Sequence, residues 1–148
     1  MPADNDAASI ETTVRRLYAA LGTGDVSSAD SILAADWQDI PHSPHAAPGV
    51  AGFRELIGFL NAAFADFSVT VDDVLVSGDR AAVRSTARGT HQGEVLGIPA
   101  TGRVVEYRAS DVHQVVDGRI TVSWHLEDFF GLVSQLGATF SASASASA

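Results

Sequence analysis

Residues 67–91, FSVTVDDVLVSGDRAAVRSTARGTH, contain the change of pattern that decides the fold. Before this stretch, apolar residues recur at helical spacing. Within it, apolar and polar residues alternate, as they do in half-buried strands. The alternation at residues 69–71 resumes one residue out of phase at 74–76, which predicts a bulge at residues 72–73. A strand is expected to follow over residues 80–91.

Helical patterns dominate the part of the chain that precedes this stretch. We expect a first helix from Ile10 to Leu21, ended by the glycines that follow it, and a short second helix over about residues 25–35. A third helix carries an apolar stripe from Phe53 to Phe64. The proline-rich segment at residues 41–48 is expected to have no regular structure.

Strands dominate the part that follows. Two long strands are expected at residues 103–116 and 119–127, and a last helix at 128–136. Helices followed by a run of strands are typical of an α+β domain, in which helices pack on one face of a curved antiparallel sheet and leave a pocket. We expect one domain over residues 9–137, between a flexible N-terminus at 1–8 and a disordered Ser/Ala tail at 138–148.

Composition narrows the chemistry and the partners. The 148 residues include no cysteine, and all nine basic residues are arginine, so thiol nucleophiles, disulfides and lysine chemistry are excluded. A formal charge of −9 disfavours nucleic acid and anionic membrane surfaces as partners. The first nine residues have neither a basic region nor an apolar run, so no secretory signal is expected and a cytoplasmic location is predicted.

One segment carries a recognisable motif. Residues 90–103 read THQGEVLGIPATGR, followed by Asp-Gly-Arg-Ile at 117–120 and Gln-Leu-Gly at 135–137. With the helical first half, this pattern resembles the SnoaL-like polyketide cyclases of the nuclear transport factor 2-like superfamily, over about residues 8–137. The resemblance implies a cone-shaped fold, dimerisation through the sheet, no cofactor and an acid–base residue in the pocket.

The chain departs from the family pattern at the acid–base position. The family's cyclases carry an aspartate on the last strand, and the matching position here is His125. Where those enzymes can carry a histidine on the preceding strand, this chain has Asp111. The resemblance therefore implies an exchanged pair, with both residues in the site.

Whether Asp111 and His125 share a face depends on the hairpin register. A two-residue turn at Asp117-Gly118 places them on opposite faces, whereas a three-residue turn starting at Val116 places them on the same face. The second register is preferred because it separates polar from apolar residues. It puts these residues on the pocket face: Tyr107, Asp111, His113, Thr121, Ser123 and His125.

The preferred register predicts an acid–base pair. The imidazole of His125, oriented by Asp111, is expected to take a proton from an activated methylene of the substrate, while His113 or His91 polarises the carbonyl that is attacked. The further residues expected to bind substrate are Tyr107, Trp37, Ser123 and Phe64. No metal is expected, since His42 and His45 have no carboxylate at ligand spacing.

These features predict a cofactor-free enzyme of the cyclase type acting on an apolar, carbonyl-rich small molecule. Two alternatives stay open: an isomerase, dehydratase or epoxide hydrolase of the same superfamily, and a non-catalytic small-molecule binding or assembly protein. Ile120, Val122 and Trp124 are expected on the outer sheet face, where bulky apolar residues predict a homodimer.

Overall fold

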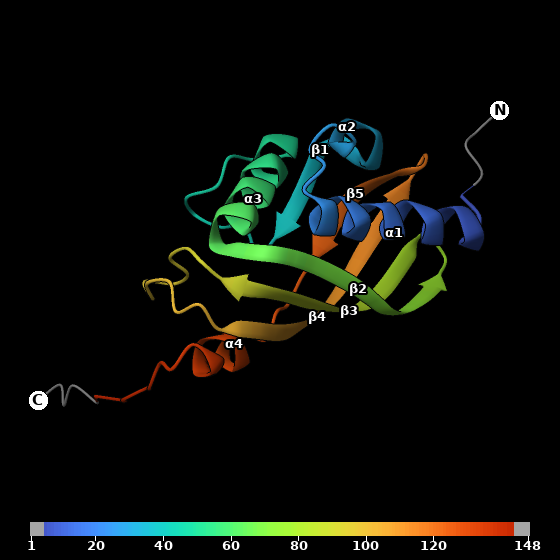
Figure 1. Ribbon diagram of the computed structural model, residues 1–148. Helices are drawn as coiled ribbons and strands as arrows, with labels where there is room; N and C mark the ends of the chain where they lie inside the picture. The colour runs from blue at the N-terminus through green and yellow to red at the C-terminus, as the bar shows by residue number, and fades with distance from the viewer. Residues whose placement is uncertain (1–4, 144–148) are drawn as a thin grey trace, which may run out of the picture.

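A five-stranded sheet forms the centre of the protein, and helices α1 and α3 lie across one of its faces (Figure 1). The computed structural model describes residues 5–143. In chain order the elements are α1 (Ala7–Thr23), α2 (Ala29–Ile32), β1 (Leu33–Ile40), α3 (Val50–Ala63), β2 (Phe64–Ser77), β3 (Arg80–His91), β4 (Val104–Val116), β5 (Arg119–Trp124) and α4 (Phe129–Gln135). The strand order is β1-β5-β4-β3-β2. The predicted α+β class, with N-terminal helices on a curved sheet, is confirmed.

Helix α1 is closed at both ends by its own sequence. The Asp6 side chain accepts a hydrogen bond from the Ser9 amide at 2.8 Å, and Gly24 adopts a left-handed conformation with φ of 74°. The helix therefore starts at Ala7, inside the segment expected to be a flexible N-terminus. Residues 1–4 of that segment and 144–148 of the Ser/Ala tail lie outside the described residues.

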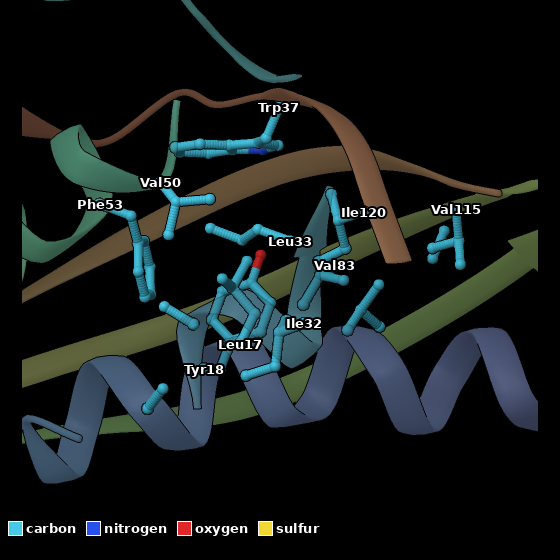
Figure 2. Packing of buried hydrophobic residues seen from close by; sticks show 14 of the residues in the cluster. Leu17, Tyr18, Ile32, Leu33, Trp37, Val50, Phe53, Val83, Val115 and Ile120 are labelled. Carbon is cyan, nitrogen blue, oxygen red and sulfur yellow. The ribbon is translucent and has the colours of Figure 1, made fainter. Parts of the chain in front are cut away.

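The main core lies between α1 and the strands (Figure 2). Leu17 and Tyr18 project from α1 toward Val83 of β3 and Ile120 of β5, and the Tyr18 hydroxyl points away from its helix. Burial of such side chains contributes about 1.5–3 kcal/mol each. The core thus fixes α1 on the same face of the sheet as the inward residues of β3, β4 and β5.

Strand β1 corrects two expectations. Residues 25–35 were predicted to form one helix, but only Ala29–Ile32 is helical, and Leu33 begins a strand. This strand pairs in parallel with β5, and Asp39 lies opposite Ser123. The predicted antiparallel pairing holds for the other three strand pairs, and this pair alone is parallel among the described strands. Local sequence favoured a helix, and the strand is stabilised by a partner more than eighty residues away.

The β4–β5 hairpin begins in the first of the two expected registers and matches neither beyond a bulge. Asp117 and Gly118 form a two-residue turn with φ of 51° and 74°, and Val116 pairs with Arg119. A bulge then inserts Thr121. The three-residue turn was wrong, and Thr121 sits in the bulge instead of lining the pocket face.

The bulge nevertheless restores the predicted grouping of polar residues. Beyond it, His113 pairs with Ser123, so both side chains face inward together with Asp111. Before it, Ile120 pairs with Val115 and is fully buried in the core. The expectation that Ile120 lies on the outer face with Val122 and Trp124 was wrong, because the extra residue reverses the side-chain alternation.

Strand β2 contains the bulge predicted from its change of phase. The β2–β3 register shifts between Val71 and Asp73. A second shift, between Ala65 and Ser68, surrounds Asp66, which has φ of 53°. The two shifts increase the curvature of the long β2–β3 pair, which bends around the helices.

Candidate functional site

A pocket of about 570 Å³ opens between the sheet, α1, α3 and the loop at residues 41–49. Its walls are apolar, with side chains from three helices: Leu17, Leu21, Phe53, Leu56, Phe59 and Phe129. Its polar end is formed by β1, β4 and the residues after β5. An apolar chamber of this size with polar groups at one end is typical of small-molecule sites.

His125 lies at the polar end between two carboxylates. Its Nδ1 contacts both oxygens of Glu127, at 2.9 and 3.1 Å, and its Nε2 lies 3.4 Å from Oδ1 of Asp39. Nε2 also lies 3.0 Å from the carbonyl oxygen of Pro41. The three ionisable groups come from β1 and from the segment after β5, which the parallel pairing of these strands brings together.

Both ring nitrogens of His125 act as donors. A carbonyl oxygen can only accept, so Nε2 donates to Pro41, and the carboxylate of Glu127 accepts from Nδ1. The hydrogen bond to Glu127 raises the pKa of His125 to about 9, supported by the charge of Asp39 and opposed by burial. At neutral pH the side chain is an imidazolium and a proton donor.

Asp111 does not orient His125, contrary to the expected pair. Its Oδ2 accepts from the Tyr18 hydroxyl at 2.7 Å, and its Oδ1 accepts from the Leu126 amide at 3.2 Å. Burial raises the pKa of Asp111, and these hydrogen bonds oppose that effect. The carboxylate holds the backbone between His125 and Glu127, while Glu127 orients the imidazole.

A chain of hydrogen bonds crosses the inner end of the pocket and finishes at Asp111. The Trp37 indole donates to Ser123 Oγ at 3.0 Å, and Ser123 lies 2.8 Å from His113 Nδ1. His113 Nε2 lies 2.7 Å from the Tyr18 oxygen. Tyr18 donates its proton to Asp111, so its oxygen accepts from His113 Nε2. In a neutral His113 the other nitrogen, Nδ1, then accepts from the Ser123 hydroxyl, whose oxygen accepts from the indole.

This order requires a neutral His113. Burial lowers the pKa of His113 to about 4, and the positive charge of His125 acts in the same direction. Burial, together with the charge of Asp111, raises the pKa of Tyr18, so its hydroxyl keeps its proton. His113, Ser123 and Trp37 thus line the pocket as predicted, within a fixed hydrogen-bonded group.

Three predicted substrate-binding residues lie elsewhere. Phe64, His91 and Tyr107 belong to a neighbouring apolar region, and none of them lines the pocket. The ring centroid of Phe64 lies 6.2 Å from that of His91 and 6.5 Å from that of Tyr107. His91 is fully buried and its Nδ1 accepts from the Thr101 amide at 3.2 Å, so it closes the loop that follows β3.

Sequence reasoning missed Asp39 and Glu127. The spacing of Glu127, two residues after His125, was a usable signal, because alternate residues of an extended segment share a face. Asp39 gave no such signal, since its position depends on the long-range β1–β5 pairing.

Neither a metal site nor a membrane-spanning helix is present in residues 5–143. This part of the chain contains no group of three or more histidine and acidic side chains arranged to hold a metal ion. Its helices also include none that is long and apolar enough to cross a membrane.

The fold and the pocket define a class: an α+β protein whose curved sheet and helices enclose an apolar chamber with acid–base groups at one end. The model of the SnoaL-like polyketide cyclase family matches residues 11–136. The chain belongs to this family, which indicates an enzyme of the polyketide cyclase type.

Individual relatives agree with this membership. Nogalonic acid methyl ester cyclase of Streptomyces nogalater is 27% identical over 128 residues, covering 82% of this chain and 92% of that protein. The structure of TsrD from Streptomyces laurentii has a TM-score of 0.84 and 34% identity, covering 90% of this chain and 98% of that one. IdmH from Streptomyces antibioticus has a TM-score of 0.75 and 32% identity, covering 87% and 99% of the two chains.

Proposed function

We propose that this protein catalyses an aldol-type ring closure in a polyketide substrate that carries an activated methylene between carbonyls. One observation carries the proposal. The apolar pocket ends at an imidazolium, His125, held between the carboxylates of Asp39 and Glu127. Such a cluster supplies both a proton donor and a proton acceptor next to an apolar, ring-sized chamber.

The role of His125 follows from its contacts. As an imidazolium it stabilises the negative oxygen of an enolate or alkoxide and then donates its proton to it. A substrate oxygen reaches Nε2 by replacing the Pro41 carbonyl, which lines the same pocket. This differs from the base role expected from the sequence, because both nitrogens already carry protons. A pocket carboxylate takes the proton from carbon.

The alternative reactions begin in the same way or lack a required group. An isomerase or dehydratase also starts with enolate formation, so the product distinguishes it from a cyclase. Epoxide opening with an Asp/Arg cluster is not supported, because Arg108 is exposed and no arginine lines the pocket within the described chain.

The test uses nogalonic acid methyl ester, the compound named for the Streptomyces nogalater relative, with a panel of other polyketide methyl esters. We expect ring closure by the wild-type protein and a loss of about 10²- to 10⁴-fold in kcat for His125→Ala. Leu126→Ala is the matched control, since Leu126 is exposed and does not line the pocket. Tight binding of the panel without turnover would replace this function with that of a binding protein.

We also propose that two copies pair through the outer sheet face that bears Val122 and Trp124. Both residues are only partly buried, and the Arg80 guanidinium lies 5.0 Å from the Trp124 ring. A single monomeric species in sedimentation experiments at micromolar concentration would refute this pairing.

A further inference from the structure

Four carboxylates line the pocket, and their hydrogen bonds differ: Asp39, Glu55, Asp111 and Glu127. The C–H proton must go to one whose oxygen is free to accept it, since a carboxylate oxygen already bound to strong donors is a weaker base. Hydrogen-bond occupancy therefore separates the four candidates.

Three of these carboxylates already accept hydrogen bonds from the protein. Glu127 places both oxygens on His125 Nδ1, and Asp111 accepts from Tyr18 and Leu126. Glu55 accepts from the Ala47 amide at 3.0 Å through one oxygen, and it is excluded by its position, since it is exposed and makes no hydrogen bond or ion pair with His125.

Asp39 is different. It sits on β1 opposite Ser123, so its side chain faces the pocket, where 31% of it is exposed. Its only contact closer than 4.0 Å with a charged partner in the described chain is His125 Nε2, at 3.4 Å. No backbone amide or hydroxyl of that part of the chain donates to it, and burial raises its pKa.

We propose that Asp39 is the residue that removes the proton from the substrate carbon. This inference rests on the proposed ring closure and names the proton acceptor of that reaction. The carboxylate and the imidazolium act as a pair, one on the reacting carbon and the other on the oxygen that becomes negative.

Asp39 and His125 together supply and recover every proton that the reaction needs. An Asp39 oxygen takes the proton, and the C–H electrons form the enolate. The enolate carbon attacks a second carbonyl carbon, whose π electrons move to oxygen, and His125 Nε2 donates its proton to that alkoxide. The Asp39 carboxyl then returns its proton to Nε2 across the 3.4 Å separation, which restores both groups. Net, one C–H and one C=O become a C–C bond and a hydroxyl.

The test measures two steps separately on nogalonic acid methyl ester in D₂O. Deuterium entering recovered substrate at the reacting carbon reports proton removal, and product reports ring closure. We expect Asp39→Asn to lower both by about 10²- to 10⁴-fold with little change in KM. We expect His125→Gln to lower ring closure similarly while its deuterium exchange stays at least about tenfold above that of Asp39→Asn.

Asp36→Asn is the matched control, because it removes the same charge from an exposed position of the same strand, outside the pocket. Near-ultraviolet circular dichroism checks that Asp39→Asn keeps its native packing. Asp39→Glu, which keeps the carboxylate, is expected to exceed Asp39→Asn in exchange.

The outcomes separate the two proposals. Ring closure by Asp39→Asn within threefold of wild type, or exchange lost in His125→Gln and kept in Asp39→Asn, would refute the role of Asp39 alone. Failure of the wild-type protein on the whole methyl ester panel would refute the proposed function as well.

Discussion

Replacing Glu127 with glutamine should lower the pKa of His125 from about 9 toward its ordinary value of 6.5. The hydrogen bond between Glu127 and Nδ1 is the largest cause of the raised pKa, and glutamine removes its charge while keeping its shape. Asp39 and the Pro41 carbonyl remain, so we expect a value between the two limits.

The size of the effect follows from the pKa. One pKa unit corresponds to about 1.4 kcal/mol, so the rise from 6.5 to about 9 corresponds to about 3 kcal/mol. The side chains of His125 and Glu127 are 24% and 22% exposed, and solvent screening reduces the contribution to about 1–2 kcal/mol.

The direction of the pH dependence of stability follows from the pKa of His125, which is higher in the folded than in the unfolded protein. The charged His125 stabilises the fold fully below pH 6.5, and this contribution is lost as the pH rises through about 9. The difference in unfolding free energy between wild type and Glu127→Gln should therefore shrink by about 1–2 kcal/mol from pH 6 to pH 10.

Two measurements check this prediction. NMR titration of the His125 ring, assigned with His125→Gln, gives the pKa directly, and urea unfolding from pH 6 to pH 10 gives the stability difference. Glu94→Gln, on an exposed loop, is the control for loss of one negative charge. A wild-type pKa near 6.5, or the same pKa in both proteins, would show that the ion pair is not formed in solution.

Three further predictions concern the polar chain, the sheet and the bulge. Tyr18→Phe leaves Asp111 and His113 without their shared partner and should cost about 1–3 kcal/mol in urea unfolding, whereas Tyr107→Phe, whose hydroxyl bonds to nothing in the described chain, should cost less. Gly89→Ala places a Cβ 2.9 Å from Phe64 Cβ and should destabilise by about 1–3 kcal/mol, while Gly58→Ala in α3 meets no atom within 4 Å and should stabilise by about 0.5–1 kcal/mol. Ile120→Ala should cost about 2–5 kcal/mol and Val122→Ala clearly less, and equal losses would contradict the inward turn of Ile120 at the bulge.

The spacing of apolar residues was sufficient to predict an element wherever one helical or strand period runs through it. The strand at residues 80–91 and the bulge of β2 at residues 72–73 were both predicted from alternation alone. The family motif also placed Asp111 and His125 in one pocket.

Long-range pairing explains what could not be predicted. Strand β1 begins with a leucine and two alanines, which favour a helix locally, and only its pairing with β5 makes Leu33–Ile40 extended. The contacts of His125 depend on that strand, through Asp39 and Pro41. The expected partner, Asp111, was wrong for this reason, although its face of the sheet was right.

The edge position of β1 sets the order in which the protein can be assembled. Within residues 5–143 its only strand neighbour is β5, which is synthesised some eighty residues later. Until Arg119–Trp124 has been made, β1 lacks this partner, while β2 and β3 can already form their hairpin. Joining such distant segments carries a loop-closure cost and slows folding. A ribosome-bound or C-terminally truncated chain ending before β5 would hold much of the scaffold and Asp39 but would lack His125 and Glu127, so the acid–base cluster would form only after β5 had docked beside β1.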